Sequence, residues 1–117
     1  MVSGIHAALS GLMALQKKVE SSANNIANIN TSGYKKTVVT LAEQEPQGVA
    51  AQVQTVETPG SMVYEQTSEG QTLVEQSNVD LAEELPNLML SRRFFQANLK
   101  TVQTEDAMLG MLLDTKS

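Results

Sequence analysis

The side chains that could carry acid–base or nucleophilic chemistry are few in this chain and lie apart in the sequence. The single histidine, His6, has no acidic or hydroxyl partner placed beside it by spacing, so a capping or surface role accounts for it. Glu83 and Glu84 are adjacent and would point to different faces of a helix, which separates them as a catalytic pair. The chain has no cysteine, no glycine-rich phosphate loop and no metal-ligand spacing. We therefore expect no enzymatic activity, no cofactor and no metal site.

Asparagine is the polar residue whose placement is most unusual. Four asparagines crowd the end of the first predicted helix, although asparagine is a poor residue for a helix interior: Asn24, Asn25, Asn28 and Asn30. Fraying and C-capping can explain Asn30 and Asn28, but they do not readily explain Asn24, which lies almost two turns earlier. Amide side chains on a helix can instead form hydrogen bonds across a close-packed interface and fix its register. Both explanations stay open from the residues alone.

Two arginines followed by two phenylalanines, Arg92 to Phe95, form the other candidate group. Arg92 falls on a predicted apolar stripe, so we expect it to snorkel, to be carried outward by a kink, or to meet an acid such as Asp106 or a partner's carboxylate. Phe95 is expected to anchor the core. Phe94 points to another side and is expected to contact a neighbouring molecule.

Length and composition limit the classes of protein that this chain can represent. With 117 residues and four aromatic side chains, it has room for one domain with a small core, which favours self-association or a partner. The net charge of −5, with eight scattered basic residues, disfavours nucleic-acid binding. No run of about 18 apolar residues is present to insert into a membrane. The start also lacks the charged residues and apolar run of ~7–15 residues of a cleaved secretory signal.

Two long helices are predicted, one at each end of the chain. In the first, a spacing of three and four residues gives one stripe, broken only by a serine: Ile5, Ala8, Leu12, Leu15, Val19, Ser22, Ile26 and Ile29. The helix is expected to end at Asn30–Gly33, where glycine can adopt a positive φ. The same spacing returns in the second helix at Leu81, Leu85, Leu88, Arg92, Phe95, Leu99, Val102, Asp106, Leu109 and Leu113. Apolar side chains off both stripes predict further neighbours.

The start of the second helix carries conflicting signals. Ser77 or Asn78 can cap it, and Asp80 favours its positive end. Pro86 lacks a backbone donor and clashes with the preceding turn, which costs about 3 kcal/mol in a helix interior. We therefore predict a kink near Ala82–Pro86, or a helix that begins at Pro86.

The middle of the chain, Thr37–Gln76, is richer in Val, Thr and Gln and predicts short strands. Residues 49–56 alternate as a half-buried strand would. Thr58–Ser61 predicts a turn, after which Ser61–Gln66 could pair back, and Ser68–Gly70 predicts a second turn. A β-hairpin or a three-stranded meander is expected here.

Together these elements predict a mainly α fold with a small β element. The long N- and C-terminal helices are expected to pair as a coiled coil, with the short β-hairpin or meander between them. Residues 1–36 together with residues 77–117 would form a helical core domain. Residues 37–76 would form a small β-rich and loop segment, in which Glu43–Gly48, with Pro46, is a loop.

Motifs at both ends of the chain resemble those of the bacterial flagellar axial proteins, the family of rod and hook subunits. The N-terminal one is Ala-x-Asn-x-Ala-Asn followed by Asn-Thr-x-Gly-Tyr, within Ser22–Tyr34. The C-terminal one combines Asn78-Val-Asp80 with Glu84, Arg93-x-Phe95-x-x-Asn98, and Asp106 with Met108-Leu109. They stand in the right order and cover about two thirds of the chain. The short length and the stretch from Gly48 to Tyr64 are most similar to a short proximal-rod protein of the FlgC type.

This resemblance implies a structural subunit of the flagellar basal-body rod. Such a subunit polymerises through its terminal helices into the axial tube that transmits torque and houses the export channel. Implied partners are further copies of the chain, other flagellar rod proteins and the flagellar type III export apparatus, which would pass it unfolded to the periplasmic rod without a cleaved signal peptide.

The expected assembly-interface residues are Asn24, Asn25, Asn28, Asn30, Gly33, Tyr34, Asn78, Asp80, Arg93, Phe94, Phe95 and Asn98. The alternative function is a soluble coiled-coil adaptor or export chaperone that binds flagellar axial proteins and mimics their ends.

Overall fold

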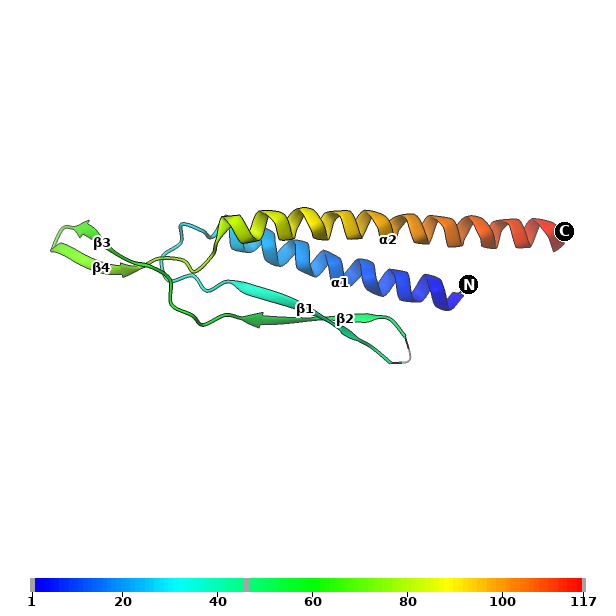
Figure 1. The fold of residues 1–117 in the computed structure, drawn as a ribbon, viewed down its shortest axis with the longest axis horizontal. Helices are drawn as coiled ribbons and strands as arrows, with labels where there is room; N and C mark the ends of the chain where they lie inside the picture. The colour runs from blue at the N-terminus through cyan, green and yellow to red at the C-terminus, as the bar shows by residue number, and fades with distance from the viewer. Residues whose placement is uncertain (1, 46, 117) are drawn as a thin grey trace.

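The computed structural model describes residues 2–45 and 47–116, with side chains from Gly4 to Asp114. The elements follow in the order α1 (Val2–Ala27), β1 (Thr37–Glu43), β2 (Val49–Thr55), β3 (Met62–Thr67), β4 (Gly70–Glu75) and α2 (Leu81–Lys116). The molecule is a narrow rod that measures 80 × 24 × 20 Å. Figure 1 shows the two helices side by side, with both chain ends at the same end of the rod.

Helix α1 buries the stripe that its sequence predicts. Ala8, Leu12, Leu15 and Ser22 are buried, and the remaining members of the stripe are half-buried. The helix ends at Ala27, slightly earlier than expected, and a turn leads to Gly33. Gly33 has φ +73°, as predicted, a conformation that a side chain would disfavour.

Helix α2 begins at Leu81, and Asp80 caps it. The Asp80 carboxylate accepts a hydrogen bond from the backbone N–H of Ala82 at 3.0 Å, and the Asp80 carbonyl accepts one from Glu84 at 2.9 Å. The negative charge also suits the positive end of the helix dipole. The prediction that Ser77 or Asn78 caps this helix is therefore wrong, because both residues lie outside it and bond elsewhere.

Pro86 lies inside α2, and the predicted helix start at this residue is wrong. In the view of Figure 1 the ribbon runs on through this region as one helix, without the predicted kink. Pro86 is the sixth residue of α2, so the bond lost is the one that its N–H would donate to Ala82. That position lies just beyond the first four N–H groups of the helix, which lack such partners in any case, so Pro86 interrupts one hydrogen bond in the second turn and α2 continues past it.

The helices pack antiparallel, but α2 turns a different face to α1 than its apolar spacing predicts. The half-buried members of the predicted α2 stripe are Leu88, Phe95, Val102 and Leu109. Its other members are exposed: Leu81, Leu85, Arg92, Leu99, Asp106 and Leu113. The positions just before most of these, Glu84, Ser91, Asn98 and Glu105, are buried or half-buried instead. Polar residues thus occupy part of the face of α2 that contacts α1. The spacing of apolar residues therefore does not identify this face.

The middle of the chain forms two separate antiparallel hairpins, and no meander is present in the described residues. β1 pairs with β2 from Thr37 opposite Thr55 to Glu43 opposite Val49. β3 pairs with β4 from Met62 opposite Glu75 to Thr67 opposite Gly70. The predicted strand at residues 49–56 and the turn at Ser68–Gly70 are confirmed, but the pairing of Ser61–Gln66 with that strand is wrong. In the predicted loop at Glu43–Gly48, Glu43 belongs to β1, and Pro46 lies outside the described residues.

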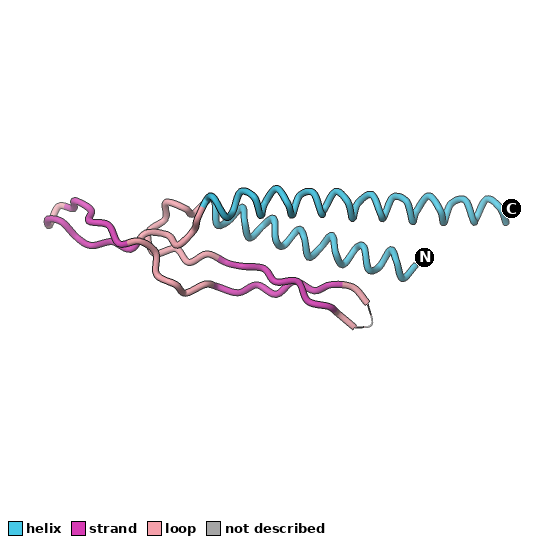
Figure 2. The backbone as a smooth tube through the Cα atoms, viewed as in Figure 1, coloured by secondary structure: helices cyan, strands magenta, loops and turns pink. Residues whose placement is uncertain are grey.

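The two hairpins have different surroundings. β1 and β2 run along α1, and Val39 of β1 is buried there (Figure 2). The Ser10 hydroxyl on α1 accepts a hydrogen bond from the Val49 N–H at 3.0 Å and so holds the start of β2. β3 and β4 project beyond the helices at the opposite end of the rod from the chain ends (Figure 1). None of the described helices combines the length and apolar character needed to cross a membrane.

Candidate assembly interface

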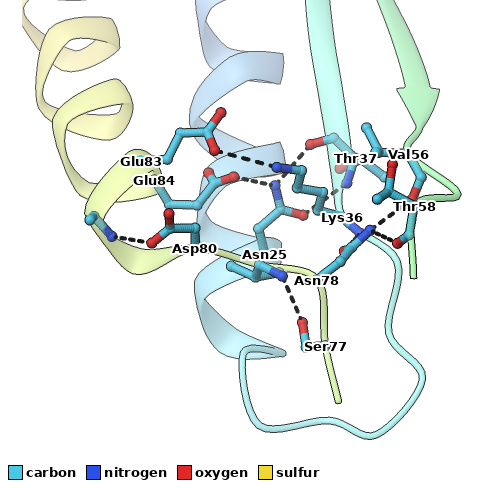
Figure 3. A network of polar contacts seen from close by, with 12 residues as sticks. Asn25, Lys36, Thr37, Val56, Thr58, Ser77, Asn78, Asp80, Glu83 and Glu84 are labelled. Carbon is cyan, nitrogen blue, oxygen red and sulfur yellow. Dashed lines mark hydrogen bonds and ion pairs between the residues drawn. The ribbon is translucent and has the colours of Figure 1, made fainter. Parts of the chain in front are cut away.

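Asn25 is the most deeply buried large side chain, with 1% of its surface exposed, and it joins three elements. Its amide nitrogen donates to the Thr37 carbonyl at 2.8 Å and to Glu84 Oε1 at 3.0 Å. Its amide oxygen accepts from the Thr37 N–H and from the Tyr34 hydroxyl, each at 3.0 Å. One side chain therefore ties α1 to the first strand and to the start of α2 (Figure 3). Asn25 also gives a hydrogen-bond donor to Glu84, a side chain that is only 6% exposed.

Burial raises the pKa of the Tyr34 hydroxyl, and the negative charge of Glu84 raises it further. Tyr34 therefore stays protonated at neutral pH and can donate to Asn25. Ser21 completes the contact on α1, because its hydroxyl donates to the Thr37 carbonyl at 3.0 Å. The described side chains leave no buried nitrogen or oxygen atom here without a hydrogen bond. Such a fully satisfied network favours one unique arrangement.

Asn78, which lies just before α2, connects further segments of the chain through its side-chain amide. Its amide oxygen accepts from the Lys36 N–H at 2.7 Å, and its amide nitrogen donates to the carbonyls of Val56 and Thr58, each at 2.9 Å. Figure 3 shows Asn78 beside Asn25, reaching across to Val56 and Thr58 in the loop after β2. Asn78 thereby holds together the entry to β1, the exit from β2 and the approach to α2. We call the region around Asn25 and Asn78 the polar junction.

Glu75 fixes the base of the second hairpin to this junction. Its carboxylate is paired with Lys35 and accepts a hydrogen bond from the Gly60 N–H at 3.2 Å. These two hydrogen bonds, Lys35 first, hold the pKa of Glu75 below its usual value. Gly60 must be glycine for steric reasons, since a Cβ atom there would lie 2.0 Å from the Gln76 carbonyl oxygen. The hairpin is therefore anchored at its base, although β3 and β4 pack against no other described helix or strand.

Acid is expected to loosen this anchor. The lowered pKa of Glu75 means that its contribution is present above the ordinary glutamate pKa and is lost as pH falls through the lower value of the folded state. We expect amide hydrogen exchange at Gly60 to accelerate on acidification, beyond the intrinsic pH dependence of exchange. Glu75→Gln should show the faster exchange already at pH 7 and little further change. Equal protection in the two proteins at pH 7 would contradict this role of Glu75.

Away from the junction, contacts between α1 and α2 fall at positions spaced by multiples of seven residues on each helix. A Cβ atom on Gly4 would lie 2.7 Å from the Glu105 carboxylate, and one on Gly11 would lie 2.6 Å from the Asn98 amide. Two further steps of seven lead from Gly11 to Asn25 and from Asn98 to Glu84, which are hydrogen bonded. A small or amide residue on α1 thus faces a polar residue on α2 at each of these contacts. Asn98, one of the expected interface residues, packs against Gly11 within the chain.

The remaining predicted interface residues are on the surface or in turns. Asn24 and Asn30 are exposed. Asn28 donates to the Asn24 carbonyl at 2.8 Å and accepts from Thr31, so it caps the end of α1 as one of the two explanations proposed. Arg93 is exposed, Phe94 is 53% exposed and Phe95 is half-buried. The predicted set therefore divides into residues that shape the chain and residues that are free to meet a neighbour.

Several residues that complete the polar junction were not predicted. Glu84 is part of the C-terminal motif but was not among the expected interface residues, and neither were Ser21, Thr37 and Glu75. The one signal in the sequence was the spacing of seven that links Glu84 to Ser91 and Asn98 on α2. Its meaning depends on the partner face of α1, which cannot be placed without the fold.

Large apolar side chains remain exposed along the whole rod. On α2 they include Met89, Leu90, Phe94, Met108 and Met111, and on the second hairpin Met62, Tyr64 and Leu73. An open groove of about 480 Å³ runs between the helices and is lined by Gln16, Val19, Leu88, Arg92 and Phe95. No group of three or more potential metal-ligand side chains gathers among the described residues. These features suit contact with other protein surfaces.

Comparison with known proteins supports this interpretation at both ends of the chain. Residues 5–35 match the family model described as "Flagella basal body rod protein". Residues 71–115 match the model described as "Flagellar basal body rod FlgEFG protein C-terminal". The two matched segments contain most of α1 and α2, and with them Asn25, Asn78 and Glu84 of the polar junction.

Individual relatives agree with the family models. The chain is 38% identical over 50 residues to the flagellar basal-body rod protein FlgG of Bacillus subtilis, which covers 43% of this chain and 19% of FlgG. It is 51% identical over 43 residues to the flagellar hook protein FlgE of Helicobacter pylori, covering 37% of this chain and 6% of FlgE. It is also 51% identical over 35 residues to the hook-basal body complex protein FlhO of B. subtilis, covering 30% and 13%. The chain thus spans less than a fifth of each relative.

Proposed function

Because the chain belongs to the family of flagellar axial proteins, we propose that it is a structural subunit of the flagellar axis, and specifically of the basal-body rod. The observation that carries this proposal is the meeting of the two family-matched segments. Residues 5–35 and 71–115 are far apart in the sequence, yet they form one antiparallel helix pair closed by Asn25 and Glu84. No catalytic step is part of this role.

The proposed mechanism is assembly through the terminal helices. Residues 1–36 and 77–117 would form the polymerising core domain, and residues 37–76 would contact neighbouring subunits. The seven-residue register between α1 and α2 supports coiled-coil packing, and the many exposed apolar side chains supply the surface that further copies would cover. Many copies around a central channel would form the tube that transmits torque.

Rod rather than hook is favoured by the description of the N-terminal family model and by the match to FlgG, a rod protein. Assignment to the FlgC type stays a prediction. Passage through the flagellar type III export apparatus is part of the same proposal. A small core with few buried apolar side chains suits a chain that must unfold for export and refold against its neighbours.

The predicted interface residues take two roles in this proposal. Asn25, Gly33, Tyr34, Asn78, Asp80 and Asn98 would shape the subunit through contacts within the chain. Arg93 and Phe94, with exposed Asn24 and Asn30, would meet neighbouring subunits directly.

Deletion of the gene tests the proposed function in the native bacterium. We expect electron micrographs of basal bodies from the deletion strain to lack a complete rod and a hook, and the intact gene to restore both. Complete rods and hooks in the deletion strain would overturn the proposal.

Substitution of Phe94 is expected to affect assembly more than the folding of the single chain. Its side chain is half-exposed beside β1, so Phe94→Ala should lower the free energy of unfolding by only about 1 kcal/mol, from the area that it buries. The same change should strongly reduce recovery of the chain in purified basal bodies. The matched variant Phe95→Ala removes a more buried ring and should cost more stability, measured by chemical denaturation. A larger stability loss for Phe94→Ala, with normal recovery in basal bodies, would show that the assignment is reversed.

A further inference from the structure

The second hairpin presents an apolar face that nothing covers within the described chain. Tyr64 lies opposite Leu73 in the register, and Met62 stands two residues before Tyr64, so the three side chains share one face of the hairpin. These side chains of Met62, Tyr64 and Leu73 are 53%, 70% and 51% exposed. A two-stranded hairpin without further neighbours is marginally stable in water. A partner over this apolar face would therefore stabilise it.

The same hairpin is acidic. Residues 62–75 contain three glutamates and neither lysine nor arginine. Glu75 is paired with Lys35 at the base, whereas Glu65 and Glu69 are exposed and belong to none of the salt bridges among the described residues. A surface that complements the hairpin therefore combines apolar groups with positive charge.

One exposed side of α2 has this combination. Residues 85–104 contain three basic residues and no acidic residue. The basic residues lie on a side of the helix that recurs at spacings of three and four residues and is exposed throughout, here called the basic face: Met89, Arg92, Arg93, Gln96, Leu99 and Lys100. None of the salt bridges among the described residues includes these three cations. The two apolar members are 60% and 41% exposed.

We propose that the second hairpin of one copy docks on the basic face of another copy. Its apolar face packs on Met89 and Leu99. Glu65 and Glu69 lie near the three basic side chains, and an arginine beside the ring of Tyr64 adds a cation–π contact. Tyrosine and arginine are the residues that most often dominate the energy of protein interfaces. This inference rests on the proposed function and deepens it by assigning one contact between subunits.

A single chain cannot make this contact with itself. β3 and β4 project beyond the start of α2 (Figure 1), whereas the basic face begins at Met89, about 12 Å further along the helix in the other direction. The hairpin and the basic face are also two different surfaces. Each copy therefore offers one of each, and the contact leaves both surfaces at the ends of a series open for further copies.

The lengths of the parts set the displacement between docked copies. The 36 residues of α2 account for about 54 Å of the 80 Å length, so the molecule extends roughly 26 Å beyond the start of α2. The middle of the hairpin lies in this part, about 16 Å from the helix start. The middle of the basic face lies about 20 Å along α2. Docking therefore displaces each copy by about 36 Å, close to half the molecular length, and also sideways by the thickness of the contact.

Photocrosslinking tests the contact in the full-length chain. A single hairpin face is smaller than a standard stable interface, so covalent trapping is suited to it. With p-benzoyl-phenylalanine in place of Tyr64, we expect irradiated basal bodies to yield a covalent dimer of the chain, attached within residues 85–104. Thr72 is the matched control position, because it is exposed on the opposite face of the hairpin and should not attach there. Attachment from position 64 to another hairpin, to α1 or to a different protein would overturn the proposal.

Charge reversal supplies a second readout on the same dimer. Arg93→Glu/Lys100→Glu should lower the dimer yield by at least about two- to fivefold, the range for one exposed ion pair. Addition of Glu65→Lys/Glu69→Lys to this variant should restore the yield. Lys17→Glu changes an exposed lysine on α1 and should leave the yield unchanged. Equal yields from the control and the Arg93→Glu/Lys100→Glu variant would overturn the proposal. All of these residues are exposed, so the circular dichroism spectra should match that of the unchanged chain.

These results are distinguishable from a failure of the proposed function. A chain that is recovered in basal bodies without attachment of position 64 to residues 85–104 would refute this contact and leave the rod assignment intact. A chain that is absent from basal bodies but forms the dimer as concentrated purified protein would support the contact and refute the rod assignment. Absence from basal bodies together with no dimer in solution would refute both.

Discussion

Replacement of Asn25 by alanine is expected to lower the free energy of unfolding by about 3–5 kcal/mol, because one buried and two half-buried groups lose their partner, and an unsatisfied buried group costs about 1–3 kcal/mol. Those groups are the Thr37 N–H, the Tyr34 hydroxyl and the Glu84 carboxylate. A small domain has a total stability of about 5–15 kcal/mol, so the loss would remove a large share of it. Asn25→Asp should be at least as damaging, since it would place a second carboxylate beside Glu84.

Chemical denaturation followed by circular dichroism measures this loss. Asn24→Ala is the matched control, because it removes the same amide from the neighbouring, exposed position and should change stability by less than about 0.5 kcal/mol. Similar stabilities for Asn25→Ala and Asn24→Ala would contradict the role that we assign to the polar junction.

Replacement of Asn78 by alanine has the second largest expected effect, about 1–3 kcal/mol, since it leaves the Lys36 N–H and two carbonyls without their partner. Asn78 is only half-buried, so water can replace part of what is lost. The damage should therefore be local and should separate the two hairpins from the start of α2.

Amide hydrogen exchange distinguishes this local loosening from global unfolding. In Asn78→Ala we expect the Lys36 amide to lose protection while amides in the middle of α1 keep theirs. Asn30→Ala provides the control, since Asn30 is exposed beyond the end of α1. Unchanged protection at Lys36 would show that Asn78 does not hold the entry to β1.

Most of the buried face of the first helix was predictable because apolar side chains mark it, although the buried Ser21 and Asn25 lie off the predicted stripe. From Ile5 to Ile29 each position of the predicted stripe is buried or half-buried. The second helix could not be read in this way, since Glu84, Ser91 and Asn98 occupy positions that apolar residues usually hold. Their burial is tolerated because α1 supplies Asn25 and Gly11 opposite two of them. The face of α2 thus depends on a partner about 60 to 90 residues away in the sequence.

Strand pairing was less predictable than strand position. Residues 49–56 and the turn at Ser68–Gly70 carry local signals, and both predictions were confirmed. The Thr58–Ser61 segment reads as a hairpin turn, yet it connects two hairpins, because β2 is already paired with β1 and Asn78 holds Val56 and Thr58. Contacts made by one distant side chain therefore overrode a local turn signal.

Asn25, Tyr34 and Asn78 entered the predicted interface set mainly through the family resemblance, and spacing alone could not assign their partners. Each bonds to backbone or carboxylate groups whose position follows from the complete fold. Contacts of the exposed residues Arg93 and Phe94 with other molecules remain predictions.

Quantitative mass spectrometry of basal bodies purified from the native bacterium tests the central claim most directly. The account predicts recovery of this chain in several copies per basal body, at a level comparable with other rod proteins. Its absence from basal bodies, together with abundance in the soluble fraction, would contradict a structural role in the axis and would favour the adaptor or export chaperone.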